Sequence, residues 1–216
     1  RGSTTATNTS GTISSQVRAN PTYGQSIVKW TGNGTTGHGL SSAPEMIIVK
    51  PINATGAWWT WHKDLSNTSQ GFLQLNTSAA EATNSSLWDN ASPVSATTIN
   101  ANTAYINYAT DNYIAYCFHS VSGYSKFGTY NGTGSANNAI TLGFRPAFLM
   151  VKRTNSTEDW FIFDSTRNPL NTVNLRLKAN TTDADGAYSY VNFTDTGFSW
   201  QATGTGQNGS GDSYIY

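Results

Sequence analysis

The fold is decided by the stretch PEMIIVKPINATGAWWTW at residues 44–61, which recurs as PAFLMVKRTNSTEDWFIF at residues 146–163. In both copies a run of apolar residues is followed by a polar turn and then by an aromatic run. Such a pattern is typical of a β-hairpin with both strands in the core. The opening prolines, Pro44 and Pro146, are 102 residues apart. We therefore predict two buried β-hairpins that belong to an internal repeat.

The repeat extends well beyond these two hairpins. Leu40 is followed by Leu142 at the same spacing of 102 residues. The triplet Asp111-Asn112-Tyr113 is followed by Asp212-Ser213-Tyr214 at a spacing of 101 residues. Because the spacing changes so little along the chain, we interpret the two halves as copies of one ancestral block.

The composition indicates an all-β protein. Charged residues make up 11% of the 216 residues, the formal net charge is zero, and aromatic residues make up 12%. Strong helix formers are scarce, whereas β-branched and aromatic residues are frequent. There is no basic field to attract nucleic acid and no apolar run long enough for membrane insertion, so we expect neither partner. The single cysteine, Cys117, lies in an apolar run and is expected to be a buried free thiol.

Each half contains about seven short strand-like segments separated by turns, which is typical of a β-sandwich. We predict two tandem, internally duplicated antiparallel β-sandwich units of jelly-roll-like type. One large β-sandwich formed by both repeats is the alternative. The expected domains are repeat 1 at residues 26–121 and repeat 2 at residues 122–216. Residues 1–25 are expected to form a linker, an edge strand or the end of a preceding module.

Several segments resemble a β-rich module of tailed-bacteriophage virion proteins, including those of marine phages and cyanophages. In the second half the segments are GFRPAFLMVKR at residues 143–153 and IFDSTR at residues 162–167. In the first half they are GHGLSSAPEMIIVK at residues 37–50 and DNYIAY at residues 111–116. The resemblance covers residues from about 14 to 216.

The resemblance implies a virion structural protein, in the first place a module of a tail fibre or appendage that contributes to host attachment. Other virion proteins, further copies of the chain in a homo-oligomer (in the first place a trimer) and a host cell-surface glycan are the implied partners. A capsid decoration or scaffold protein without a ligand is the alternative, and a polysaccharide-degrading tailspike-type enzyme is a third possibility. Compared with the family, the last strand, which ends at Tyr216, is expected to be truncated.

The residues give no indication of catalytic or metal chemistry. His38, His62 and His119 are far apart in the sequence and lack metal-ligand spacing. We expect no enzyme activity, no metal and no cofactor. A glycosidase would need two facing carboxylates, for which the candidates include Glu45, Glu81, Asp89, Glu158 and Asp164. For Asp164 we expect an ion pair with Arg167 instead.

Most of the seven tryptophans are expected in the core, because an aromatic residue recurs at the related position of the other half. Trp88 has no such counterpart and lies in a loop rich in Asn and Ser. Tryptophan faces stack well on sugar rings. Trp88 and the nearby Asn90 are therefore the candidate ligand-binding residues.

Overall fold

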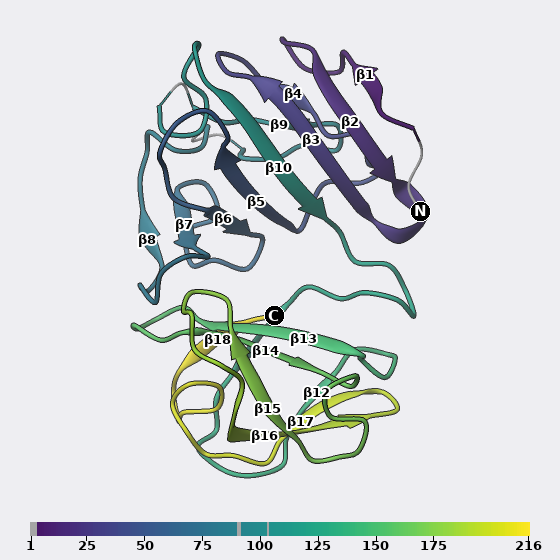
Figure 1. The fold of residues 1–216 in the computed structure, drawn as a ribbon, viewed down its shortest axis with the longest axis vertical. Helices are drawn as coiled ribbons and strands as arrows, with labels where there is room; N and C mark the ends of the chain where they lie inside the picture. Colours follow the sequence, from purple (N-terminus) through teal and green to yellow (C-terminus); the bar gives the residue numbers. More distant parts are fainter. Residues whose placement is uncertain (1–3, 90–91, 103) are drawn as a thin grey trace. The chain divides into compact units, whose positions relative to one another are not determined.

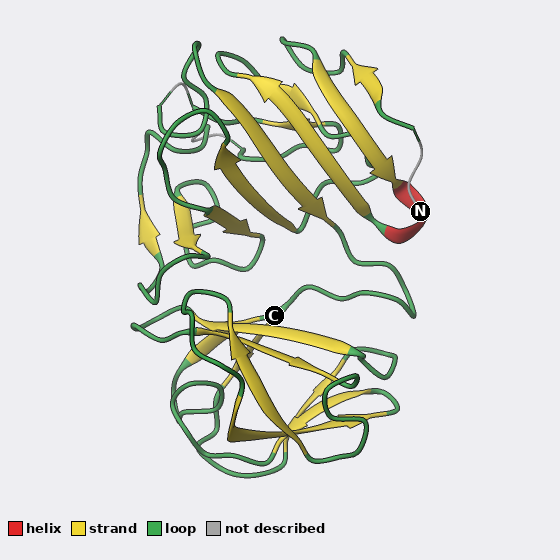
Figure 2. Cartoon of the chain, viewed as in Figure 1, coloured by secondary structure: helices red, strands yellow, loops and turns green. Residues whose placement is uncertain are grey.

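The computed structural model describes residues 4–89, 92–102 and 104–216. The protein is all-β, as predicted, and within these ranges the helical structure consists of one 3-10 turn, η1 at Pro21–Tyr23 (Figure 2). No helix of the described chain is long and apolar enough to cross a membrane.

Both predicted hairpins are present. In the first, β5 (Met46–Pro51) pairs with β6 (Trp59–His62), and Ile47 lies opposite Trp61. In the second, β13 (Phe148–Arg153) pairs with β14 (Trp160–Asp164), and Leu149 lies opposite Phe163. Both pairs are antiparallel, and all four residue pairs of the first hairpin recur in the second, shifted by 102 residues. The two apolar and aromatic runs thus pair in the same register in both hairpins.

The chain forms two compact units. The first comprises the residues up to Gln74 and Ala82–Val121, and the second comprises Leu75–Glu81 and Ser122–Tyr216. The short segment Leu75–Glu81 therefore belongs to the second unit, although it lies between two strands of the first. Two of its backbone contacts on that unit are the hydrogen bonds from Glu81 N to Thr154 O (2.8 Å) and from Glu158 N to Ser78 O (2.9 Å).

In the first unit, the described strands form an eight-stranded antiparallel sheet in the order β1–β2–β3–β10–β5–β6–β7–β8 and a two-stranded ribbon, β4–β9 (Figure 1). The segment expected to be a linker or edge strand supplies β1 and β2, and β2 pairs with β3. Besides β5 and β6, the strands are β1 (Ala6–Asn8), β2 (Ser15–Asn20), β3 (Gln25–Thr31), β4 (Thr36–Gly37), β7 (Gly71–Gln74), β8 (Ala82–Thr83), β9 (Thr98–Ile99) and β10 (Asn112–Phe118).

In the second unit, the described strands form a sheet in the order β11–β18–β13–β14–β15–β16–β17–β12 that is nearly closed, like a barrel. Its two end strands come together where Asn138 Nδ2 of β12 donates to Asn131 O of β11 (3.0 Å). Besides β13 and β14, the strands are β11 (Thr129–Asn131), β12 (Asn138–Thr141), β15 (Val173–Lys178), β16 (Gly186–Thr194), β17 (Gly197–Trp200) and β18 (Ser213–Ile215).

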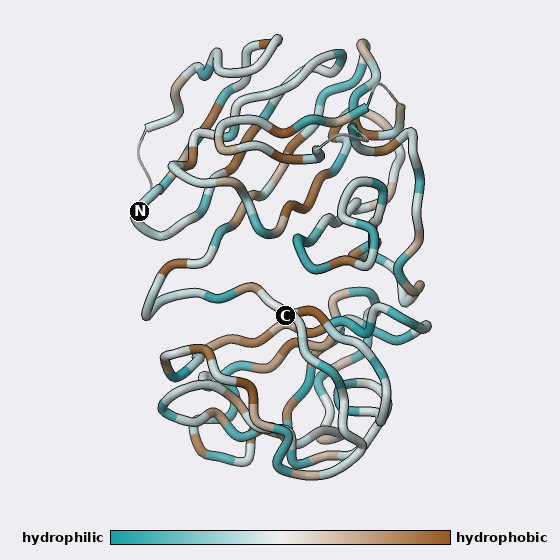
Figure 3. Tube along the Cα trace, turned by 180° about the vertical axis from the view of Figure 1, so that it is seen from behind, coloured by the Kyte–Doolittle hydropathy of each residue, from teal (hydrophilic) through white to brown (hydrophobic). Residues whose placement is uncertain are grey.

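Along β2, β3 and β10 the core of the first unit lies on one face of the main sheet, whereas β5 is buried on both faces. Along β3 the side chains alternate strictly, so that Ser26, Val28 and Trp30 are buried while Ile27 and Lys29 are exposed. The same alternation runs along β2 and β10. Figure 3 colours the chain by hydropathy, and brown apolar stretches are interspersed with pale and teal segments along the first unit. Cys117 is a fully buried free thiol, and burial raises its pKa.

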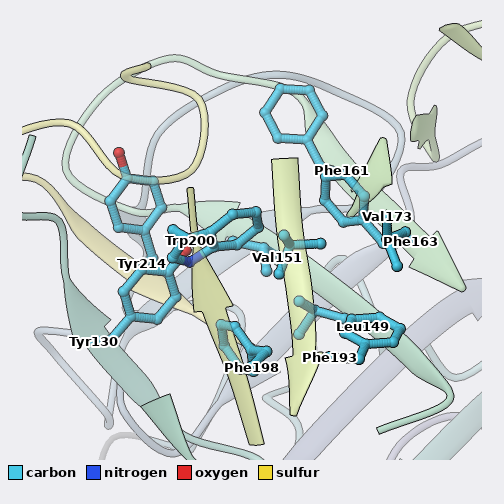
Figure 4. Close-up of a cluster of buried hydrophobic side chains, with 11 residues drawn as sticks. Tyr130, Leu149, Val151, Phe161, Phe163, Val173, Phe193, Phe198, Trp200 and Tyr214 are labelled. Atoms are coloured by element: carbon cyan, nitrogen blue, oxygen red, sulfur yellow. The ribbon is translucent and has the colours of Figure 1, made fainter. Parts of the chain in front are cut away.

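The core of the second unit is an aromatic cluster inside the curved sheet (Figure 4). Tyr130 of β11 stacks on Tyr214 of β18, with ring centroids 4.9 Å apart, and meets Phe198 of β17 edge-on at 6.0 Å. Trp200 packs edge-on against Phe163 at 5.6 Å. Aromatic pairs in these geometries stabilise a core beyond the area that they bury.

Candidate functional site

A pocket of about 310 Å³ lies in the first unit. Four connections of the chain contribute described residues to it: the segment before β2, the turn between β3 and β4, the loop between β8 and β9, and the loop that leads into β10. The residues that line it are small or polar: Thr12, Asn33, Gly34, Thr35, Asp89, Ala101, Asn102 and Asn107.

Asn107 holds two of these connections together. Its side chain is almost fully buried, and its Oδ1 accepts hydrogen bonds from Asn33 N (2.9 Å) and Trp30 Nε1 (3.3 Å). Its Nδ2 donates to Gly34 O (3.1 Å) and Ala101 O (3.0 Å). The amide thus uses both lone pairs and both hydrogens, which is its full capacity. The pocket floor is therefore fixed by a saturated buried network.

The turn between β3 and β4 needs residues with unusual backbone freedom. Asn33 has a φ of 89°, in the left-handed region that asparagine tolerates better than most residues. A Cβ on Gly32 would clash with the carbonyl oxygen of Tyr108. The local sequence Gly32-Asn33-Gly34 is therefore what allows the turn to lie against the loop that precedes β10.

Two threonines close another side of the pocket. Thr12 N donates to Thr35 Oγ1, and Thr35 N donates to Thr12 Oγ1, both at 2.9 Å. Behind the turn, Trp30 stacks on Tyr113 with centroids 5.4 Å apart, and Tyr113 OH accepts a hydrogen bond from Tyr108 N (2.9 Å). Burial raises the pKa of Tyr113, so the ring stays a neutral part of this support.

The pocket offers hydroxyl, amide and carboxylate groups to a ligand. Asp89 is exposed at its rim, and Asn102 is half-buried, with its Nδ2 donating to Ser85 O (3.1 Å). These groups can donate to and accept from a polyol, and the described residues that line the pocket include no Lys or Arg. The arrangement therefore suits an uncharged, hydroxyl-rich ligand better than an anion.

The second unit contains a related network around Asn208. Its Oδ1 accepts from Thr133 N (3.0 Å), and its Nδ2 donates to Ser135 O (2.8 Å) and Ala202 O (2.9 Å). Asn138 Nδ2 donates to the same Oδ1 (2.8 Å), as Trp30 Nε1 does to Asn107. Tyr214 OH accepts from the backbone N–H five residues earlier, as Tyr113 OH does.

The prediction that Trp88 is a surface contact is wrong. Trp88 is fully buried, and its Nε1 donates to Gly71 O (3.0 Å). A ring of this size is stable beneath a polar loop because its apolar area leaves water while its N–H keeps a partner. The other candidate, Asn90, lies outside the described residues. The neighbouring Asp89 does reach the pocket.

Each of the three histidines contacts backbone groups close to it in the sequence. His38 is buried, its Nδ1 accepts from Leu40 N (3.1 Å), and burial lowers its pKa. His62 Nδ1 accepts from Asp64 N (3.2 Å), and His119 Nδ1 lies 2.9 Å from Ser120 O. Within the described residues, no group of three or more His, Cys, Asp or Glu side chains could hold a metal ion.

Two of the acidic candidates form ion pairs with nearby cations. Arg167 Nε lies 2.6 Å from Asp164 Oδ2, which confirms the predicted ion pair. Burial of Asp164 opposes its ionisation, but the hydrogen bonds and charge of Arg167 outweigh burial and lower its pKa. Burial of Glu45 is likewise outweighed by hydrogen bonds from Ser120 and by the charge of Lys63, so its pKa is also lowered.

Most of the pocket residues could not be recognised from the sequence, because contacts such as those between Asn33 and Asn107 and between Thr12 and Thr35 join positions far apart in the chain. One signal was available. Asn107 and Asn208 are 101 residues apart, which is the spacing of the repeated Tyr113 and Tyr214. A buried residue that recurs in register with a repeat is a candidate for a shared structural role.

Comparison with known proteins places the chain in a family. No curated protein and no solved structure matches it. One family model matches residues 1–216, which is the whole chain. The chain therefore belongs to the family described as a domain of unknown function, DUF7483.

Proposed function

We propose that this domain is a structural and adhesive module of a phage virion, in a homo-oligomeric tail fibre or appendage, and that the polar pocket of its first unit binds a saccharide of the host surface. The viral setting rests on the sequence resemblance described above. The binding role rests on the pocket. Its lining of hydroxyl, amide and carboxylate groups is the single observation that carries the proposal.

The pocket is suited to binding because its supporting groups are held in place. Asn107 fixes the turn and the loop through four hydrogen bonds, and the reciprocal bonds of Thr12 and Thr35 hold a second side. A ligand that enters such a site loses less free energy to ordering the protein. Saccharide hydroxyls both donate and accept, as does this lining.

We propose further that the two predicted repeats, residues 26–121 and 122–216, arose by duplication of one block. The order β3–β10–β5–β6–β7 in the first unit corresponds to β11–β18–β13–β14–β15 in the second. The hairpin registers coincide after a shift of 102 residues. The networks around Asn107 and Asn208 also coincide in their backbone partners, at a shift of about 101 residues.

A two-layered, sandwich-like packing of each unit is part of the same proposal. In the first unit, the ribbon β4–β9 is separate from the main sheet, and its Thr36 and Ile99 are buried. In the second unit, Phe163 of β14 packs against Trp200 of β17 in one buried cluster, although β15 and β16 separate these strands in the order of the sheet. Both observations favour two layers around one core in each unit.

The experiment is a glycan-array and host-cell binding assay with the labelled domain. We expect the wild type to bind a subset of neutral or weakly charged glycans. Asp89→Asn should weaken this binding roughly tenfold or more, because a hydrogen bond to a charged group contributes about 1.5–3 kcal/mol. The control is Asp195→Asn, which removes the same charge at a side chain that is 99% exposed in the second unit.

Two results would overturn the proposal. Absence of binding to every glycan and every host cell would favour a decoration or scaffold protein without a ligand. Equal binding by the wild type and Asp89→Asn would show that the pocket is not the binding site. Incubation of each bound polysaccharide with the domain, followed by sizing of the polymer, separates attachment from the alternative of a degrading enzyme.

A further inference from the structure

The outer face of the main sheet in the first unit has a composition unlike that of the pocket. In the register of β2, β3, β10 and β5, one row across the sheet contains Gln16, Lys29, Ile114 and Lys50. The next row contains Arg18, Ile27, Tyr116 and Ile48. Residues paired across neighbouring strands lie on the same face, and so do residues two positions apart along a strand. Arg18, Lys29 and Lys50 therefore share this face.

The middle of the face is apolar and partly open. Trp58 stacks on Tyr116, with ring centroids 6.5 Å apart and an angle of 24° between the planes, and both residues are only half-buried. Ile27, beside Tyr116 in the register, is 43% exposed. In Figure 1 strands β2, β3 and β10 cross this unit with no other element drawn over them, and the connection through β9 passes behind. The rear view in Figure 3 has that connection in front.

The charge on this face has one sign. The four strands β2, β3, β10 and β5 contain Arg18, Lys29 and Lys50 but no Asp or Glu. In the described chain, Lys63, Arg153 and Arg167 form ion pairs with carboxylates, whereas none of the ion pairs includes the three cations of this face. In a protein of zero net charge, a face with three cations and no carboxylate is complementary to an acidic partner.

We infer that this face binds an acidic polysaccharide. An extended polymer can lie across a flat sheet, with sugar rings against Trp58 and Tyr116 and its carboxylate or sulfate groups near the cations. Lys29 and Lys50 lie on strands separated by β10, roughly 10 Å apart at two strand spacings, so they can meet two anionic groups of one chain. The inference rests on the proposed attachment function and names a ligand class for a second surface of the same unit.

Nucleic acid fits the face less well. Its affinity depends on neutralising many phosphates, and binding through so few cations is weak at physiological salt. The face supplies three cations over several apolar side chains, and the whole chain supplies no net positive charge. A polymer with spaced anionic groups and apolar ring faces matches the face better than a continuous phosphate backbone does.

The test measures binding of the whole domain to polygalacturonate and to its fully methyl-esterified, uncharged form. Dextran sulfate with dextran, and a single-stranded DNA oligonucleotide, are the further arms. We expect binding to polygalacturonate, to dextran sulfate or to both, decreasing with salt, and at least tenfold weaker binding to the uncharged polymers and to DNA. The two acidic polymers distinguish a carboxylate from a sulfate ligand.

The variants are chosen to leave the fold intact. Lys29→Glu changes an exposed side chain and should weaken polyanion binding about tenfold, because it replaces an attraction with a repulsion of similar size. The control Lys126→Glu makes the same charge change at an exposed lysine of the second unit and should leave binding unchanged. Trp58→Ala should weaken binding without changing the salt dependence, and its far-UV circular dichroism must match the wild type.

The outcomes separate this inference from the proposed pocket. Asp89→Asn should leave polyanion binding unchanged, and Lys29→Glu should leave array binding through the pocket unchanged. Equal losses in Lys29→Glu and Lys126→Glu, or equal affinity for DNA and the polysaccharides, would overturn the inference as general electrostatics. If the domain binds neither acidic polymer but still binds glycans on the array, the inference about this face is wrong and the proposed role of the pocket is unaffected.

Discussion

Replacement of Asn107 by Ala should strongly destabilise the first unit. The substitution removes four hydrogen bonds and leaves Trp30 Nε1, Asn33 N, Gly34 O and Ala101 O without this partner. A typical hydrogen bond contributes about 0.5–1.5 kcal/mol net, and unpaired buried groups cost more. Because the bond from Trp30 is long at 3.3 Å, we expect a loss of about 3–5 kcal/mol in the free energy of unfolding.

The assays are urea unfolding, which gives the free energy of unfolding, and native-state hydrogen exchange, which reports the stability of each unit separately. Asn208→Ala should produce a loss of similar size in the second unit, since its side chain makes five hydrogen bonds in a buried site, one of them long at 3.4 Å. Asn53→Ala is the control. Its exposed side chain accepts from Asn112 N and should contribute no more than about 1 kcal/mol. A loss below about 1 kcal/mol for Asn107→Ala would refute the argument that this network holds the pocket.

Three further changes test the physical account. Burial lowers the pKa of Lys152 from 10.5 to about 8, so the folded protein loses this proton at a lower pH than the unfolded chain and its stability rises between pH 8 and 10.5, by up to about 3 kcal/mol. Urea unfolding at several pH values should show that Lys152→Met lacks this rise. A pH profile identical to that of the wild type would contradict the assignment to Lys152. Gly32→Ala should lower the melting temperature, because the added Cβ would clash with Tyr108 O. Gly123 has open space around it, so Gly123→Ala should cost at most about 1 kcal/mol of stability, for its positive φ. Equal losses of stability in the two variants would count against the clash. Tyr113→Phe should cost about 1 kcal/mol in unfolding experiments, because Tyr108 N–H loses its partner, and an unchanged stability would show that this bond contributes nothing.

The hairpins and the all-β class could be predicted because they depend on local sequence patterns. The apolar run around Ile47 is buried on both faces of β5, and the apolar runs of both hairpins are long enough to be recognised as core strands without knowledge of the tertiary fold. The near closure of the second sheet could not be predicted in this way. The near closure depends on the end strands β11 and β12 lying side by side. The contact of Asn138 with Asn131 that joins them is not encoded in any periodic sequence pattern.

The site was harder to predict than the fold. A surface position was predicted for Trp88 because it has no aromatic counterpart in the other repeat and lies in a polar loop. The apolar area of the ring nevertheless favours burial where its N–H finds a partner, here Gly71 O. The pocket depends on contacts between Thr12 and Thr35 and between Asn33 and Asn107. Such long-range hydrogen bonds follow from the tertiary fold, so only the recurrence of Asn107 as Asn208 could have indicated their importance in advance.

The proposed role of the pocket is tested most directly by an NMR titration of the ¹⁵N-labelled domain with the saccharide selected on the array. Our account predicts saturable shifts of the backbone amides of Asn33, Thr35 and Asn102, and their loss in Asp89→Asn. Shifts confined to the second unit, or no saturable shift with any saccharide, would contradict it.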